Sequence, residues 1–427
     1  MTLGVKRPSA YPSSKTVMPK PRQRNRRQQD STQRPAEKLT KVQSKPVEKT
    51  QYSSRICGVL FVGLLALLGG VAGLGYYRSP ITALAIADIA PVIEFERNTK
   101  LTDGEINKNF VGPESIEEDI KGNLYTGLSD GRIVRIEPSG DGRIGFGKST
   151  TIAELKLQGK RNHGRPLGVR LLGDTLYVVD AYSGLYKLNV KTSKLSKLVG
   201  LEDASPPMKF PDDLSVTADE RKIYFSDASA KYSIDELMPL ALSGLCDSRI
   251  LEYDTKTKSL KVVISGLCFA NGVQLSSDEK QLIVTETLGH KVLFYDVATW
   301  KRTKLVRLPA MPDNIRPSSK GTYWIALTNP RDGMKIVMDK YPVLRQIIAG
   351  TFSSKQLEKV ISPFCIVMEM DENGEILQTL QDPTSKLAIG ISQVTELSDG
   401  RLALGTYIAP QLVFLNPRDS KPIGSKP

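Results

Sequence analysis

Residues 266–296, GLCFANGVQLSSDEKQLIVTETLGHKVLFYD, contain the unit that decides the fold. This stretch predicts three short antiparallel strands, at 272–275, 281–286 and 291–295, because runs of Val, Ile, Leu and Tyr alternate with Ser, Asp and Gly. Asn271 stands just before the first strand, a polar residue in an apolar setting. If the unit recurs along the chain, Asn271 occupies a repeated structural position.

The chain's positive charge is concentrated in its first 55 residues. The net charge is +13, but residues 1–55 carry 14 Lys and Arg against 3 Asp and Glu, and the remainder carries 45 against 43. Residues 1–55 are poor in large apolar side chains, which predicts a disordered basic tail. The run PRQRNRR at 21–27 has the composition of a nuclear-localisation or nucleic-acid patch. The apolar segment that follows favours a cytosolic topology signal and a surface for anionic lipid, with no nucleic-acid partner.

Residues 56–77, ICGVLFVGLLALLGGVAGLGYY, contain no charged side chain. As a helix they would extend about 33 Å, enough to cross a bilayer. A cleaved signal peptide is the alternative, since Ala85-Ile86-Ala87 resembles a cleavage site, but the long basic lead favours an uncleaved signal anchor. The sequence therefore predicts a single-pass type II membrane protein. Residues 1–55 would be cytosolic, and 78–427 would face the lumen or the exterior, at the endoplasmic reticulum or the plasma membrane.

The three-strand unit recurs six times after about residue 88. The apolar position that opens its second strand is repeated at Leu124, Leu176, Ile223, Leu282, Tyr323 and Leu402. Repeats of about 50 residues with three or four strands each are typical of a β-propeller. We therefore expect an all-β fold, a six-bladed β-propeller with a helical insertion, in preference to a β-sandwich with irregular spacing.

The propeller places polar residues at one register. The first strand of each blade lines the central channel, and the residues that begin these strands are Glu114, Arg165, Asp212, Asn271, Asn314 and Ser392, with Asp313 beside Asn314. Carboxylate and amide oxygens without Cys or His suit Ca²⁺ better than Zn²⁺. Several carboxylates in a narrow channel would also repel one another without a cation. The sequence predicts a Ca²⁺ site at Glu114, Asp212, Asn271, Asp313 and Asn314; the alternative is that they only form turns and caps.

The repeats carry motifs of a known family. GRPLG at 164–168, LYVVDAY at 176–182, IYFSDAS at 223–229, RILEYD at 249–254, FANGVQL at 269–275 and PDNIRPS at 312–318 together resemble strictosidine synthase. With the basic tail and anchor, the resemblance is to the animal membrane-bound branch of that family, over roughly residues 90–420. The chain is more distantly similar to the paraoxonases. That resemblance implies a six-bladed propeller with catalytic Ca²⁺, whose ligand pattern falls on Glu114, Asp212-Asp213, Asn271 and Asp313-Asn314.

Several positions depart from these families. Asp212-Asp213 stands where Asn-Asp is usual, and Ser392 falls where the synthase has its catalytic glutamate, so strictosidine synthase activity is not expected. Leu167 falls at the paraoxonase histidine. The chain has only two histidines: His163, a weak candidate base near the channel mouth, and His290, which we expect to be structural.

Two insertions and three cysteines complete the prediction. Residues 331–364 lengthen the fifth repeat and show apolar residues at helical spacing with interleaved lysines. They predict a helix packed over the propeller face; a lid or a membrane-docking helix is the alternative. Residues 232–245 form a smaller insertion at the same mouth. Beyond residue 77, Cys246, Cys268 and Cys365 permit at most one intramolecular disulfide.

Two functional classes remain open. In the first, Ca²⁺ polarises an ester or lactone carbonyl, and Asp212 or Asp313 acts as base or nucleophile in an arylesterase-like hydrolase. In the second, the propeller is a non-catalytic membrane-bound binding protein and the ion is structural. Ser392 and the missing histidine favour binding, whereas the complete ligand set favours hydrolysis.

Overall fold

A computed structural model describes residues 52–86, 91–159, 161–331, 333–359, 364–387 and 389–416. The chain divides into two compact units, 1–60 and 61–427, and the second holds the propeller. The predicted tail, 1–55, lies almost wholly outside the described residues. Helix α1 (Tyr52–Arg78) contains the predicted signal anchor. Among the described residues, however, no helix meets the criteria of length and apolarity for crossing a membrane.

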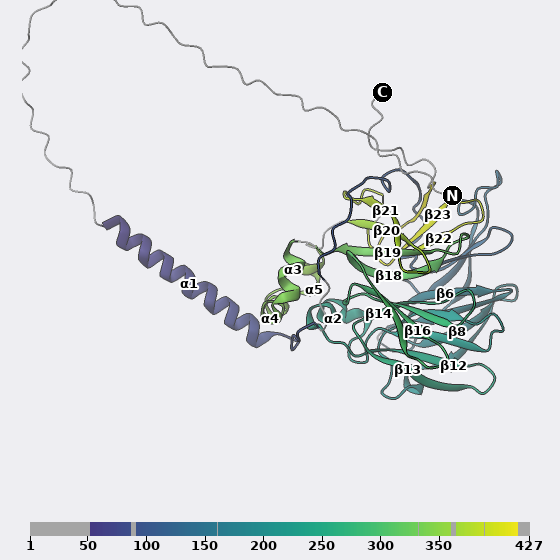
Figure 1. The fold of residues 1–427 in the computed structure, drawn as a ribbon, viewed down its shortest axis with the longest axis horizontal. Coiled ribbons are helices and arrows are strands. Elements are labelled where there is room, and N and C mark those ends of the chain that lie inside the picture. Colours follow the sequence, from purple (N-terminus) through teal and green to yellow (C-terminus); the bar gives the residue numbers. More distant parts are fainter. Residues whose placement is uncertain are drawn as a thin grey trace, which may run out of the picture. The chain divides into compact units, whose positions relative to one another are not determined.

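The described residues form six four-stranded antiparallel sheets, which are the blades (Figure 1). The innermost strands are β2 (Ile116–Glu118), β6 (Pro166–Leu172), β10 (Pro211–Val216), β14 (Ala270–Leu275), β18 (Ala310–Pro317) and β22 (Ile391–Glu396). The second strands are β3 (Leu124–Gly127), β7 (Thr175–Asp180), β11 (Lys222–Asp227), β15 (Gln281–Glu286), β19 (Tyr323–Pro330) and β23 (Leu402–Thr406). The third are β4 (Arg132–Ile136), β8 (Gly184–Asn189), β12 (Ser248–Asp254), β16 (Lys291–Asp296), β20 (Cys365–Met370) and β24 (Leu412–Leu415). The outermost are β5 (Ser149–Glu154), β9 (Lys194–Val199), β13 (Ser259–Leu267), β17 (Arg302–Arg307), β21 (Ile376–Asp382) and β1 (Glu105–Asn107).

The order of strands confirms the predicted six-bladed propeller. The first strand of each repeat is innermost, and each inner strand contacts the inner strand of the next blade around the ring. The ring is closed by the chain's own beginning, because β1 pairs antiparallel with β24, with Glu105 opposite Phe414. This pairing covers the outer edge of the last blade with an amino-terminal strand, a closure that the repeat pattern did not predict.

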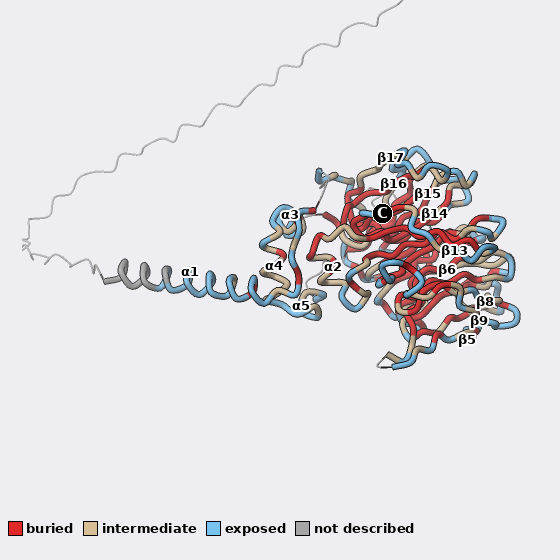
Figure 2. The backbone as a smooth tube through the Cα atoms, turned by 90° about the horizontal axis from the view of Figure 1, so that it is seen from below, coloured by how far each residue is buried: buried red, intermediate tan, exposed pale blue. Residues whose placement is uncertain are grey.

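The core lies between neighbouring blades. Tyr224 and Ile250 of the third sheet pack with Val273, Leu282 and Val284 of the fourth, for example. Figure 2 shows burial concentrated in the strands and exposure in the turns. Strands buried on both faces read as nearly continuous apolar runs, which explains why the second and third strands were recognisable from sequence.

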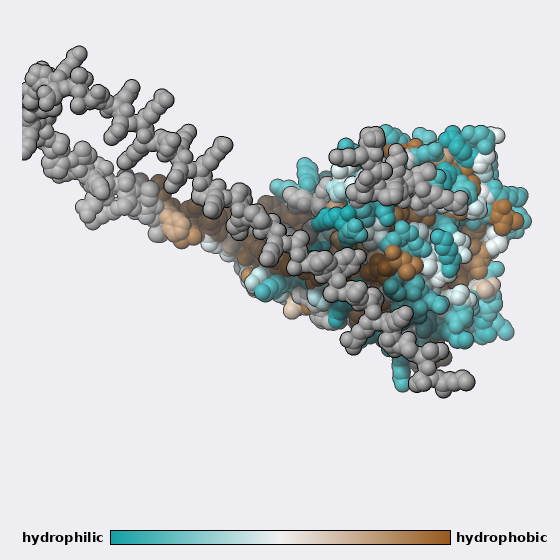
Figure 3. Space-filling view, turned by 45° about the horizontal axis from the view of Figure 1, so that its top comes forward, coloured by the Kyte–Doolittle hydropathy of each residue, from teal (hydrophilic) through white to brown (hydrophobic). Residues whose placement is uncertain are grey.

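Short helices cover one side of the propeller. The first insertion forms the 3₁₀ turn η2 (Ile234–Glu236) and α2 (Leu237–Ser243); the second forms α3 (Gly333–Lys340), α4 (Pro342–Thr351) and α5 (Ser354–Glu358). A further 3₁₀ turn, η1 (Leu201–Asp203), follows β9. Helices α2 and α4 contact each other, so the two insertions form one helical cap (Figure 1). On the face seen in Figure 3, the propeller surface is mostly hydrophilic, with small apolar areas.

A disulfide joins Cys246 to Cys268, and Cys365 is a buried free thiol. The bond ties the end of the first insertion to the chain that enters β14, directly before Asn271. Disulfides persist in oxidising compartments, so this pairing favours a secretory-pathway location for the propeller.

Candidate functional site

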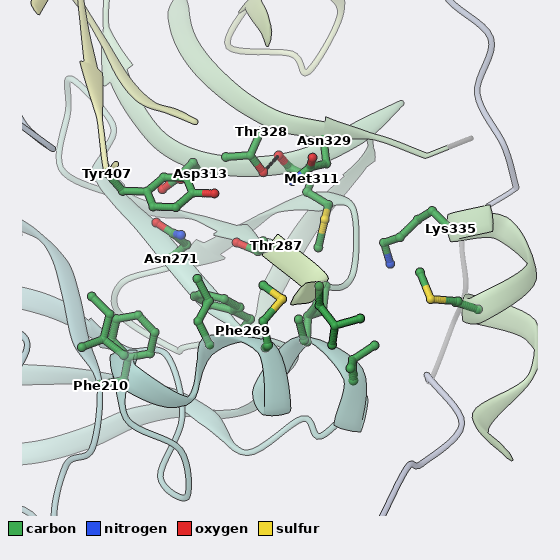
Figure 4. A pocket seen from close by; sticks show the side chains of 18 of the residues that line it. Phe210, Phe269, Asn271, Thr287, Met311, Asp313, Thr328, Asn329, Lys335 and Tyr407 are labelled. Atoms are coloured by element: carbon green, nitrogen blue, oxygen red, sulfur yellow. Dashed lines mark hydrogen bonds between the residues drawn. The ribbon is translucent and has the colours of Figure 1, made fainter. Parts of the chain in front are cut away.

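A deep pocket of about 760 Å³ opens between the inner strands and the helical cap (Figure 4). Its polar floor consists of Glu114, Asp212, Asn271 and Asp313, which all line the pocket. Its walls are mainly apolar and come from both the blades and the cap. A concave, apolar cavity of this size with a few convergent polar groups is typical of a small-molecule site.

Bulges in the inner strands aim the floor residues. The pairing of β10 with β11 shifts register between Pro211 and Leu214, and that of β14 with β15 shifts between Ala270 and Val273. The fifth blade does the same between Pro312 and Ile315. A bulge leaves residues outside the regular ladder and re-aims their side chains. The same irregularity in successive blades therefore brings polar residues from different repeats to one place.

Hydroxyl groups and one glycine hold these bulges. Thr285 Oγ1 donates to Asp313 O at 2.6 Å and accepts from Gly272 N at 2.7 Å, so it connects two neighbouring blades. A Cβ on Gly272 would lie 2.8 Å from the Cα of Asn314. Because that spacing is too short for a side chain, the Ala-Asn-Gly sequence at 270–272 requires its glycine.

The floor concentrates carboxylates in a buried position. Burial, then the nearby Asp213 carboxylate, raises the pKa of Glu114 to about 7. Burial and the charge of Glu114 raise the pKa values of Asp212 and Asp313 well above the ordinary range. Each of these carboxylates makes its neighbours harder to ionise, so a cation among them would favour their charged forms.

Asp213 faces away from the floor. Burial opposes its charge, but Arg316 and Arg170 outweigh burial and lower its pKa. Arg316 Nη1 and Nη2 donate to the two Asp213 oxygens, both at 2.9 Å, and Val273 N donates to Oδ2 at 2.9 Å. Asp213 therefore forms an ion pair with Arg316 beneath the floor, whereas Asp212 lines the pocket.

Unpaired oxygens on these residues test whether a cation fits. Glu114 Oε2, Asn271 Oδ1 and Asn314 Oδ1 are buried and have no hydrogen-bond partner among the residues described. Orphaned buried oxygens of this kind are costly unless an ion or water satisfies them, and an all-oxygen donor set suits Ca²⁺. Within the described ranges, no three His, Cys, Asp or Glu side chains are close enough to hold a metal by themselves. The fit therefore depends on amide oxygens together with carboxylates.

Three other residues singled out from the sequence, Asn314, Ser392 and His163, do not line the pocket. Asn314 is fully buried behind the floor and donates from Nδ2 to Glu114 Oε1 at 2.7 Å. Ser392 is also fully buried, and its hydroxyl donates to Glu114 O at 2.8 Å, so it holds the floor in place. His163 lies in the connection before β6 and is absent from the pocket lining; its role as a base stays a prediction.

His290 is buried against the second insertion. Burial, with the Lys335 cation, lowers its pKa to about 3, so the ring is neutral. Its Nε2 lies 4.0 Å from an oxygen of Asp339, a residue of α3.

Several pocket residues were not found from the sequence. Thr287, Tyr407, Lys335 and Arg345 all line the pocket. Burial, then the Asp313 carboxylate, raises the pKa of Tyr407 to about 12, so the phenol keeps its proton. Figure 4 shows Tyr407 close to Asp313 and Asn271. Thr287 and Tyr407 follow second strands at the end opposite the apolar position used to align the repeats, and comparison of those ends would have found them.

Comparison with known proteins identifies related sequences. Residues 212–298 match the strictosidine synthase family, and residues 94–136 match the strictosidine synthase-like N-terminal family. Adipocyte plasma membrane-associated protein of Salmo salar is 34% identical over 402 residues, which cover 87% of this chain and 94% of that protein. The Homo sapiens protein is also 34% identical, over 86% of this chain and 92% of its own length.

Similar solved structures are more distant. A putative gluconolactonase has a TM-score of 0.48 at 13% identity, covering 79% of this chain and 96% of that one. Regucalcin of Agrobacterium tumefaciens, described as a calcium-binding protein, has a TM-score of 0.47 at 11% identity, covering 73% and 93%. Scores this low support no inference about the site.

The fold and the matched motifs define a strictosidine synthase-like six-bladed propeller. Within that class, the chain belongs to the family of the adipocyte plasma membrane-associated proteins, because the identity extends over most of both sequences. The names of these relatives place them at the plasma membrane.

Proposed function

We propose that this chain is a membrane-anchored, calcium-dependent hydrolase of esters or lactones, of arylesterase or lactonase type. The observation that carries the proposal is the polar floor. Carboxylates with raised pKa values and the unpaired amide oxygen of Asn271 meet at the end of a mainly apolar pocket of about 760 Å³. Perturbed acids in a cleft are typical of active sites.

In this proposal Glu114, Asp212, Asn271, Asp313 and Asn314 would hold the ion, and Asn314 Nδ2 would also keep Glu114 in position. When bound there, Ca²⁺ would polarise the substrate carbonyl and stabilise negative charge on its oxygen. Asp313 Oδ or Asp212 Oδ would accept a proton from the attacking water or attack the carbonyl itself. Tyr407 retains its phenolic proton and can donate a hydrogen bond into the pocket. The apolar walls exclude bulk water and strengthen these interactions.

A non-catalytic binding protein is the second candidate. Neither of the chain's two histidines lines the pocket, so no imidazole is available there as a base. Ser392, at the synthase's glutamate position, bonds to the backbone of Glu114 instead of facing a substrate. In this case the ion would stabilise the floor, and the pocket would hold its ligand without reaction.

The membrane part of the proposal depends on residues 56–77. They are uncharged, lie within α1 and follow a strongly basic tail. The disulfide and the relatives' names also favour a propeller on the oxidising side of a membrane. Protease protection in sealed microsomes tests this orientation: the propeller should be protected and the tail digested, whereas a digested propeller would contradict it.

Hydrolysis is tested with the purified full chain and a small aryl ester such as phenyl acetate. We expect a calcium-dependent rate that EGTA abolishes and that Asp313→Asn lowers at least about 100-fold, since one positioned acid–base group typically contributes that much. Asp141→Asn, at an exposed turn, is the matched control and should change nothing. If the folded wild-type chain hydrolyses neither aryl esters nor lactones with calcium, the hydrolase proposal fails and the binding candidate remains.

A further inference from the structure

The pocket has a second polar region on the cap, which we call the basic wall and define as Lys335 and Arg345. Lys335 belongs to α3 and Arg345 to α4, and both line the pocket. Arg345 is 2% exposed, whereas the Lys335 side chain is 21% exposed. Neither residue belongs to the proposed calcium site.

Among the described residues, one carboxylate, that of Asp339, contacts the basic wall. Lys335 Nζ lies 2.6 Å from Asp339 Oδ1, but Arg331 Nε also donates to Asp339, to Oδ2 at 2.9 Å. One carboxylate is therefore shared between two cations. His290, on the other side of Asp339, is neutral and adds no compensation.

Arg345 has no carboxylate partner in the described part of the chain. Its Nη1 donates to Leu242 O at 2.9 Å and its Nη2 to Leu84 O, while its buried Nε has no hydrogen-bond partner there. Backbone carbonyls satisfy the geometry of two donors but do not neutralise the charge. The Nε is closed off from the pocket, so Arg345 contributes positive charge to the wall and not a free donor; Asp339 is the carboxylate whose charge acts on it.

Apolar side chains separate the basic wall from the polar floor. Leu242, Leu288, Met311 and Met338 are among the apolar residues that line the pocket. In Figure 4, Lys335 lies across the cavity from Asp313, Asn271 and Tyr407, with Met311 and Thr287 between them. The cavity thus offers an anion-binding end, an apolar middle and an acidic end.

We infer that the pocket binds a single-chain amphiphile with an anionic head group. The head group, a carboxylate or a phosphate monoester, pairs with the partly exposed Lys335 ammonium and is also attracted by the nearby Arg345 charge, and the aliphatic chain lies along the apolar middle toward the floor. Both head groups accept charge-assisted hydrogen bonds from ammonium and guanidinium donors. A bound anion also favours the charged form of Lys335, whose pKa burial otherwise lowers. Binding of this kind does not require hydrolysis.

The test is equilibrium binding of radiolabelled dodecanoate to the full chain in lipid nanodiscs, with empty nanodiscs subtracted. Dodecyl phosphate is the second arm and distinguishes the two head groups, while dodecanol and dodecyltrimethylammonium test the need for negative charge. Lys335→Gln should weaken binding of the preferred anion by tenfold or more, because it removes a charge-assisted bond. Lys340→Gln, on the same helix but stacked over Tyr341, is the matched control and should bind as the wild type does.

Lys335→Glu supplies the opposite charge and should abolish anion binding and permit binding of dodecyltrimethylammonium, which the wild type should not bind. Unfolding temperatures of each variant verify that the pocket is intact. The inference is overturned if dodecanol binds the wild type as tightly as both anions, or if Lys335→Gln and wild type bind the anions equally. The proposed hydrolysis does not use Lys335. The chain could therefore fail to hydrolyse aryl esters and still bind the anionic amphiphile, or hydrolyse them without binding it, so the two outcomes are distinguishable.

Discussion

Replacing Glu114 with Gln should remove a pH-dependent loss of stability from the propeller. In the folded chain the pKa of Glu114 is about 7, against an ordinary value of 4.5, because the carboxyl is buried beside other carboxylates. The folded state therefore binds this proton more tightly than the unfolded state. Stability is full below about pH 4.5 and falls as the pH rises through 7. A shift of this size corresponds to about 3 kcal/mol when no cation is present.

Gln is the matched replacement because it keeps an oxygen that can accept the bond from Asn314 Nδ2. The full chain is unfolded with guanidinium chloride in EGTA at pH 4.5 and pH 8, and Trp300 and Trp324 report unfolding by fluorescence. The difference in free energy of unfolding between Glu114→Gln and the wild type should shift in favour of Glu114→Gln by up to about 3 kcal/mol when the pH is raised from 4.5 to 8. Because the floor carboxylates interact with one another, this gain in the free energy of unfolding reflects the interacting carboxylates together and not Glu114 alone. Glu202→Gln, at an exposed turn, should show no such trend. A Glu114→Gln difference that is the same at both pH values would refute the reasoning.

Two further predictions concern the framework of the pocket. Asp213→Asn should lower the free energy of unfolding by about 3–5 kcal/mol, because it leaves the buried Arg316 guanidinium without its bidentate partner; a loss below about 1 kcal/mol in guanidinium denaturation would contradict this. Cys246→Ser should cost about 3 kcal/mol, as expected for a bond that closes a loop with a sequence separation of 22. Cys268→Ser should cost the same and the double variant no more, so additive losses would speak against the pairing.

The repeats were predictable because most blades bury both faces of their second and third strands. Leu124, Leu176, Ile223 and their equivalents therefore stand in apolar runs that one sequence suffices to align. The closing strand β1 was not predictable in this way. It has three residues, of which one is exposed and two are half-buried, and it pairs Glu105 with Phe414 near the other end of the repeats, which no local pattern encodes.

The candidate site was predicted in part for a similar reason. Counting back from the apolar positions found Glu114, Asp212 and Asn271 directly. In the fifth repeat the count reached Asn314, whereas its neighbour Asp313 is the residue that lines the pocket. The sequence register does not predict that the Asp213 side chain binds Arg316 while Asp212 lines the pocket. The bulge that separates these adjacent side chains arises from the pairing of β10 with β11. Lys335 and Arg345 belong to insertions outside the repeat, and only the three-dimensional arrangement brings them to the pocket.

Calcium binding by the purified full chain tests the central claim most directly. After removal of divalent cations with EGTA and dialysis, isothermal titration should show one calcium ion bound per chain at the floor. Asn271→Ala, which removes an unpaired amide oxygen without altering charge, should weaken that binding by at least about tenfold while Asp141→Asn leaves it unchanged. Absence of saturable calcium binding, or equal affinity in the folded Asn271→Ala chain, would contradict the account.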